Sequence, residues 1–118
     1  MIPANLSECF DELDNIFQDS PTDYENFKMS SEDEAIIILH FGLGKWIRNN
    51  WGLWTKNTNI YHTLHAMQLW HAEDMSTVIL TAYHRYINNQ PLGLKEQVQF
   101  FLEYWKDYEQ HKGPIHKQ

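Results

Sequence analysis

The chain has little of several features that define common classes of protein. Its 118 residues include one cysteine, Cys9, so a disulfide within the chain is excluded. The longest apolar run covers residues 35–39, whereas a helix that spans a bilayer needs about 20 apolar residues. The N-terminus becomes polar and acidic within a few residues, unlike a secretory signal. These absences predict a soluble, cytoplasmic protein in which Cys9 is a buried apolar side chain.

Basic residues are scarce in the first third of the chain. Ten of the sixteen Asp and Glu residues fall between Glu8 and Glu34, where Lys28 is the only base. Ten acids and one base give −9 there, and six acids and eight bases from Ala35 onward give +2, for the net charge of −7. Such a protein lacks the basic patch on which nucleic-acid binding depends. We expect no nucleic-acid and no membrane partner, but an acidic surface that can attract a basic protein.

The apolar residues recur at the spacing of helices, and no strand or hairpin pattern is present. Hydrophobic residues make up 42% of the chain and aromatic residues 14%, with five tryptophans, which suffices for a packed core. We predict an all-α fold, a single compact domain over residues 1–118 with five or six helices. The expected helices cover residues 6–18, 21–28, 32–49, 60–68, 71–87 and 94–111.

The sequence also predicts how the helices begin, end and pack. Asn5 with Glu8 and Ser31 with Glu34 have the spacing of capping boxes, and Gly113-Pro114 should end the last helix. The segment 35–41 is apolar on most sides, so the helix over 32–49 is expected at the centre of the fold. The predicted core contains Phe10, Leu13, Ile38, Phe41, Trp46, Ile79, Phe101 and Trp105.

No constellation of residues indicates catalysis. His62 and His65 lie one helical turn apart, but a zinc site needs three or four converging ligands, and this spacing is not that of a metalloprotease motif. No nucleophile motif, P-loop or dinucleotide fingerprint is present. We therefore expect no metal, no cofactor and no enzymatic activity.

Two segments, 41–54 and 71–85, stand out because they contain both arginines, Arg48 and Arg85. A guanidinium suits buried bidentate contacts and stacking on tryptophan. We predict that Arg48 makes a buried contact with Asp74 or with a backbone carbonyl of the loop 51–54. The expected structural network comprises Arg48, Asn49, Trp51, Trp54, Asp74 and Arg85. The alternative interpretation is a small-ligand pocket at the same place.

These two segments resemble the central motifs of an uncharacterised family of small bacterial proteins, a domain of unknown function. The family pattern is F-G-L-G-x-x-I-R-N-x-W-x-L-W, then H-x-D-D-M-S and a later Y-H-R. Here Glu73 stands where the first Asp of the second motif is common. The resemblance covers about residues 35–90. It implies a bacterial origin and no known activity, and it leaves the acidic N-terminus and the last helix outside.

The function expected from these features is that of an immunity protein, which neutralises a toxin by binding it. A toxin that acts on nucleic acid needs a basic cleft, which an acidic inhibitor can occupy. The expected partner-binding residues are Asp11, Asp14, Asp19, Asp23 and Glu25. Acids at helix starts can also merely keep a protein in solution. The alternative is a housekeeping helical domain that binds a small ligand or self-assembles through its Trp-rich loop.

Overall fold

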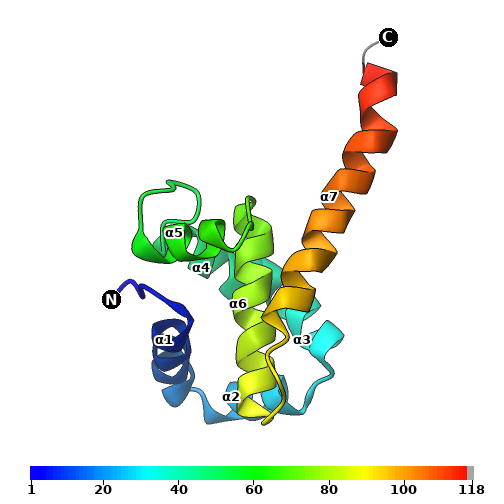
Figure 1. Cartoon of the computed structure of the whole chain (residues 1–118). Coiled ribbons are helices and arrows are strands. Elements are labelled where there is room, and N and C mark those ends of the chain that lie inside the picture. Colours follow the sequence, from blue (N-terminus) through cyan, green and yellow to red (C-terminus); the bar gives the residue numbers. More distant parts are fainter. Residues whose placement is uncertain (117–118) are drawn as a thin grey trace.

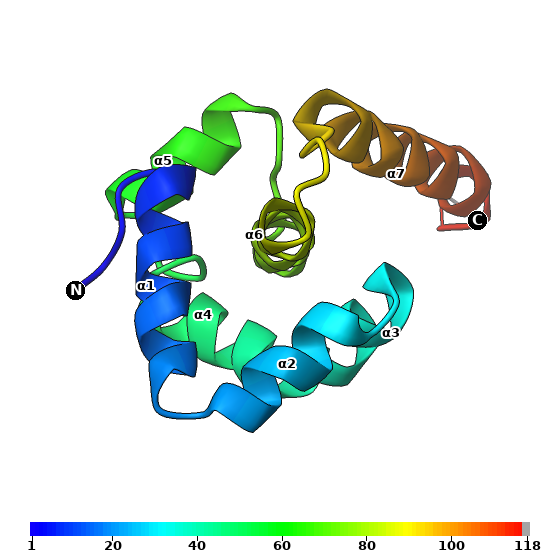
Figure 2. The same cartoon turned by 90° about the horizontal axis from the view of Figure 1, so that it is seen from below.

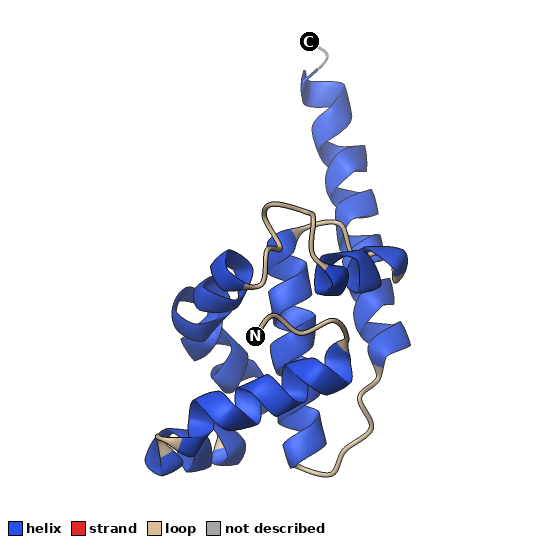
Figure 3. Cartoon of the chain, turned by 90° about the vertical axis from the view of Figure 1, so that its left-hand side faces the viewer, coloured by secondary structure: helices blue, strands red, loops and turns tan. Residues whose placement is uncertain are grey.

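The computed structural model describes the backbone of residues 1–116 and the side chains of residues 1–110. Its elements are α1 (Leu6–Gln18), α2 (Pro21–Met29), α3 (Glu32–Leu39), the π-helix η1 (His40–Gly44), α4 (Lys45–Asn50), α5 (Asn59–Ala66), α6 (Ala72–Ile87) and α7 (Leu94–His116). Because α3, η1 and α4 follow one another without a break, residues 1–116 contain six helical segments and no strand (Figures 1 and 3). The predicted all-α class is confirmed.

The central element is α6, and not the segment 32–49 as the sequence predicted. Figure 2 shows α6 end-on with the other helices arranged around it. It contacts α1, α2, α3, η1, α4 and α7. Its buried residues are Ala72, Met75, Ser76, Val78, Ile79, Leu80, Thr81, Ala82, Tyr83 and His84. A helix surrounded in this way buries most of its side chains. These side chains must therefore be apolar or have hydrogen-bond partners inside the fold.

Three residues predicted in the core lie at the surface: Ile38, Phe41 and Trp46 are 68%, 81% and 42% exposed. One reason is position, since α3–η1–α4 packs against α6 along one side only and buries Ala35, Gly44, Ile47 and Arg48. A second reason applies to Trp46, which follows η1, because the i→i+5 turn shifts the phase of later side chains relative to an uninterrupted α-helix.

The remaining predicted core residues fall into two groups. Phe10, Leu13 and Ile79 are buried, as predicted. Phe101 and Trp105 are half-buried, because α7 contacts the body of the fold with its first turns and then extends away from it (Figure 1). The helix also continues through Gly113 and Pro114 to His116, so the predicted end was wrong. Pro114 lacks an N–H and forgoes one backbone hydrogen bond there.

The predicted N-terminal caps are present. Asn5 Oδ1 accepts from the Glu8 N–H at 2.9 Å, and Glu8 Oε1 accepts from the Ala4 N–H at 2.9 Å. Ser31 Oγ accepts from the Glu34 N–H at 3.3 Å. These contacts satisfy backbone donors that the helices leave free. They fix where α1 and α3 begin.

An aromatic cluster joins α1 and α2 to the central helix. The Phe17 ring stacks on Phe27 of α2 and on Tyr83 of α6, with centroids 5.5 and 6.1 Å apart. Cys9 is fully buried nearby on the same face of α1, and burial raises the pKa of its thiol to about 12. The corner between α1 and α2 is therefore held by side chains that point inward, and its outer face is left to polar residues.

Two matched isoleucine variants test this placement. We expect Ile79→Ala to lower the free energy of unfolding by about 2–5 kcal/mol, because it removes buried methyl groups and leaves a cavity. Ile38→Ala removes the same atoms from an exposed side chain, so the change should stay within about 0.5 kcal/mol. Urea denaturation followed by circular dichroism measures both. Equal losses would contradict the central position of α6 and the surface position of Ile38.

Candidate functional site

The five acidic residues expected to bind a partner are all exposed. They are Asp11 and Asp14 on α1, Asp19 just after it, and Asp23 and Glu25 on α2; we call them the acidic surface. In the part of the chain that the structure describes, Asp14 alone among them makes a side-chain hydrogen bond or an ion pair. The other four are free to meet a ligand.

An open groove of about 440 Å³ separates α1 from α2, and Asp14 and Glu25 both line it. The Tyr83 hydroxyl donates to Asp14 Oδ1 at 2.6 Å. Burial and this hydrogen bond raise the pKa of Tyr83. Burial, with the nearby charges of Asp14 and Glu25, also raises the pKa of Tyr24 in the groove wall. The potential in this groove is therefore negative, and Asp14 has a structural role besides any binding role.

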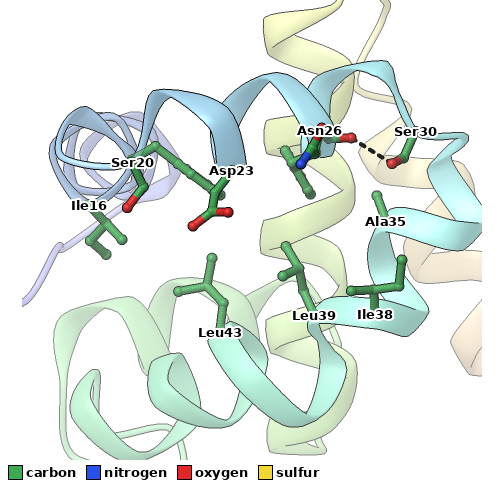
Figure 4. Close-up of a pocket in the computed structure, with 11 residues that line it drawn as sticks. Ile16, Ser20, Asp23, Asn26, Ser30, Ala35, Ile38, Leu39 and Leu43 are labelled. Atoms are coloured by element: carbon green, nitrogen blue, oxygen red, sulfur yellow. Dashed lines mark hydrogen bonds between the residues drawn. The ribbon is translucent and has the colours of Figure 1, made fainter.

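A second groove, of about 560 Å³, lies on the other side of α2, between it and α3–η1 (Figure 4). Most of its wall is apolar, and Asp23 is the one charged residue among the 11 that line it. The sequence did not reveal this groove, because the run 36–38 was expected inside the core. The available signal was that this run is apolar on every side, more than one packing face requires.

Arg48 is buried, as expected, but its partners differ from those predicted. Its Nη1 donates to Ser76 Oγ at 2.9 Å and its Nη2 to the His40 carbonyl at 3.1 Å. Neither Asp74 nor a loop carbonyl takes part, because Asp74 accepts instead from the indole of Trp105 at 2.8 Å. Within the described residues the Nε of Arg48 is buried without a partner. The guanidinium thus joins η1 to α6 through neutral acceptors.

Gly44 makes room for this arginine. A Cβ at Gly44 would lie 3.2 Å from Arg48 Nη1 and 3.2 Å from the Leu39 carbonyl, closer than ordinary van der Waals contact. Contacts therefore hold both ends of the π-helix. Gly44 lets α6 approach one end, and Arg48 binds the His40 carbonyl at the other; we call this arrangement the clamp. Phe41, inside the same π-helix, is left 81% exposed.

Arg85 forms a second polar anchor. Its Nε and Nη2 donate to the Glu32 carboxylate at 2.6 and 3.1 Å, and its Nη1 donates to the Leu92 carbonyl at 2.7 Å. The hydrogen bond from Arg85 is the main reason that the pKa of Glu32 is lowered. A Cβ on Gly93, whose φ is +60°, would lie 2.6 Å from Arg85 Nη1. Arg85 thus ties α3 and the start of α7 to the central helix.

The other residues of the expected network are divided between separate environments. Trp51 is buried, whereas Trp54 and Asn49 are exposed. His71 stacks on the Trp105 ring at 4.0 Å, and burial raises the pKa of the half-buried Asp74 beside it. A cavity of about 290 Å³ lies against His71, Asp74 and Trp105. The six expected residues therefore do not form one network. Arg48 and Arg85 make separate contacts that involve α6, and Asp74 lies at the aromatic cavity.

Among the residues that the structure describes, no group of three or more His, Cys, Asp or Glu side chains could hold a metal ion; His62 and His65 are exposed. No helix in the same residues is both long and apolar enough to cross a membrane.

A first test of the site concerns Arg48. We expect Arg48→Ala to lower the free energy of unfolding by about 2–5 kcal/mol, because it leaves a cavity and removes hydrogen bonds to a charged group. Lys45→Ala is the matched control, since Lys45 is an exposed cation on the same helix; its effect should stay within about 0.5 kcal/mol. Urea titration measures both variants. An Arg48→Ala variant as stable as the control would contradict the clamp.

A second test uses pH. The pKa of Glu32 is lowered in the folded protein, so its ionised form stabilises the fold above the unfolded value of about 4.3 and this contribution is lost as the pH falls. The difference in unfolding free energy between wild type and Glu32→Gln should therefore shrink between about pH 5 and pH 3. The control is Glu34→Gln, which removes an exposed carboxylate of the same helix that makes no ion pair among the described residues, so its effect near neutral pH should be smaller. A Glu32→Gln difference that does not change with pH would refute the pairing with Arg85.

A family model described as "Domain of unknown function (DUF6794)" matches residues 2–87. The match spans α1 to α6, so the acidic first third lies inside the family, although the motifs alone had pointed to residues 35–90. Neither the curated proteins nor the solved structures give a match. Since the matched residues make up most of the 118, the chain belongs to this family, DUF6794, a domain of unknown function.

Proposed function

We propose that this protein is a non-enzymatic, protein-binding domain, specifically a bacterial immunity protein that neutralises a basic, nuclease-type toxin by direct binding. The observation that carries the proposal is the state of the acidic surface. Asp11, Asp19, Asp23 and Glu25 are exposed and make no side-chain hydrogen bond or ion pair among the described residues. No side-chain contact within the described part of the fold uses these four carboxylates, so they are available to a partner.

The contrast with other acids in the same third of the chain supports this interpretation. Glu8 completes a helix cap and Glu32 pairs with Arg85. Their carboxylates accept hydrogen bonds within the fold, whereas the four acids of the proposal accept none among the described residues. Like charges held together on one surface repel each other and lower stability. A basic ligand would relieve that repulsion, and it would also be drawn to the surface over long range.

A second candidate function rests on a different observation. Trp54 and Trp70 are 52% and 60% exposed, and the aromatic cavity beside Trp70 also contains Asp74. Exposed tryptophans beside a cavity suit a small ligand or a contact between copies. Gene position separates the two candidates: a locus directly downstream of a large secreted-toxin gene favours immunity, and an isolated locus favours this alternative.

Charge reversal tests the first proposal. The variant changes Asp11, Asp19, Asp23 and Glu25 to Lys; Asp14 is left unchanged because it accepts from Tyr83. We expect this variant to associate more slowly than wild type with the protein encoded by the neighbouring toxin gene, and to show a weaker salt dependence. Charges at the rim of an interface act on the association rate and are screened over about 10 Å at 0.1 M salt.

The control has the same change in net charge at another place. It replaces the exposed acids Glu73, Glu96, Glu103 and Glu109 of α6 and α7 with Lys. Association rates from stopped-flow mixing over a range of salt concentrations compare the three proteins. A control as slow as the test variant would mean that only net charge matters. Equal rates and salt slopes for wild type and test variant would mean that the acidic surface has no part in binding.

A further inference from the structure

Three large apolar side chains on α3–η1 are left in water. Ile37, Ile38 and Phe41 are 71%, 68% and 81% exposed. Positions three and four apart on a helical segment are neighbours, so the three form one apolar lip. A contiguous exposed apolar patch with a polar rim is typical of an interaction site. Burial of this patch by a partner would remove its apolar surface from water, which favours binding.

The lip borders the groove between α2 and α3–η1. In Figure 4, Ile38, Leu39 and Leu43 point from α3–η1 toward α2, and Asp23 points from α2 toward them. Phe17 and Phe27 also line the groove and are almost fully buried. The groove therefore has an apolar floor that continues, through Ile38, into the apolar lip.

The charge of this groove has one sign. Asp23 is exposed and is the one charged residue among those that line it, while Ser20, Asn26 and Ser30 supply neutral polar groups. No basic side chain is among the lining residues, and Asp23 has no ion-pair partner in the described part of the chain. A group that enters beside the apolar floor therefore meets an unpaired carboxylate, which favours a cation.

The length of the walls limits the shape of the occupant. The shorter wall is α2, with nine residues, which is about 13.5 Å long at 1.5 Å per residue; the other wall, α3–η1, has eight residues in α3 and five in η1. The length of α2 equals little more than two turns of an α-helix, enough for apolar side chains at positions i, i+3 or i+4, and i+7. The volume also lies within the range of about 300–1,000 Å³ that is usual for ligand sites.

We infer that this groove is the docking site for an amphipathic helical segment of the basic protein partner. Apolar side chains of that segment occupy the groove and cover the apolar lip, and a Lys or Arg of the segment pairs with Asp23. The inference rests on the proposed function and adds the place and chemistry of the contact. The acidic surface attracts the partner, and the groove holds it.

Two other occupants fit the charges less well. A second copy of this chain would bring together two surfaces from the acidic first third, with like charges opposed. An anionic lipid or fatty acid would place its carboxylate or phosphate beside Asp23. Charge complementarity therefore selects a basic protein segment.

The test uses the full chain and three synthetic 14-residue peptides as probes. The first has Leu at i, i+3, i+4 and i+7 and Lys at the other positions; the second replaces Lys with Glu, and the third replaces Leu with Ser. Methyl signals of Ile16, Ala35 and Leu43, which line the groove, report binding by nuclear magnetic resonance. We expect saturable binding of the Leu/Lys peptide with shifts at these methyls, and no such shifts with the other two peptides.

Matched variants locate the contact. Ile38→Ser with Phe41→Ser removes two exposed side chains of the lip and should weaken Leu/Lys binding at least tenfold. Phe100→Ser with Tyr104→Ser removes two aromatic side chains of α7 that are 63% and 53% exposed, and it should leave binding unchanged. Asp23→Asn keeps the shape of the side chain and should weaken binding severalfold at low salt, with little effect at high salt.

Each result decides one point. Leu/Glu binding as tight as Leu/Lys binding, or the same loss from the α7 control pair as from the lip pair, would overturn the inference. So would a dimer in sedimentation that the lip variant dissociates, since the occupant would then be a second copy. If the lip variant has no effect while reversal of Asp11, Asp19 and Glu25, the acids that do not line the groove, still slows association with the toxin, the groove is wrong and the proposed function stands. Groove docking without an effect of that three-acid reversal would reject the proposed function.

Discussion

The burial of α6 is the constraint on which the rest of the structure depends. A helix enclosed by its neighbours presents no polar face to water, so its hydroxyl groups must find partners inside the fold. Ser76 does so by accepting from Arg48 and donating to the Glu73 carbonyl, and Tyr83 does so through Asp14. The contacts with Arg48 and Asp14 reach from α6 to α4 and to α1, whereas the Glu73 carbonyl belongs to α6 itself. The hydrogen bonds that satisfy the buried hydroxyl groups of α6 therefore also fix the positions of α1 and α4.

This arrangement determines which surface is left for function. The helices around α6 each use one side for packing, and α2 and α3–η1 are short helices whose outer sides meet water. On α1 and α2 the outer side is acidic, and on α3–η1 it is apolar. The two surfaces meet at the groove lined by Asp23 and Ile38. The acidic surface, which can attract a partner, thus lies beside an apolar area that can contribute to affinity. This combination suits protein recognition.

Much of the fold could be predicted from the sequence, because its helix signals are local. The caps at Asn5 and Ser31 and the apolar stripe of α1 depend only on neighbouring residues, and the structure agrees with them. The positions of Ile38, Phe41 and Trp46 could not be predicted, since an apolar run does not indicate how many of its sides find a neighbour. The π-helix η1 also has no recognised signature, and it changes the phase of every side chain after it.

At the candidate site, too, some features could be predicted from the sequence and others could not. The burial of Arg48 could be predicted because its planar guanidinium suits buried bidentate contacts, but its partners depend on the spacing of η1 from α6, which no local pattern encodes. The exposure of the acidic surface was predictable because the acids alternate with a buried stripe. The groove was not, because it is formed by helices that contribute residues as far apart as Ile16 and Leu43.

The central claim is that α1, α2 and α3–η1 form the binding face and that α7 does not. Hydrogen–deuterium exchange of this chain, alone and bound to the product of the neighbouring toxin gene, tests it most directly. The account predicts slower exchange on binding in residues 11–43, with exchange in residues 94–110 unchanged. Protection confined to α7, or to the loop around Trp54, would contradict it.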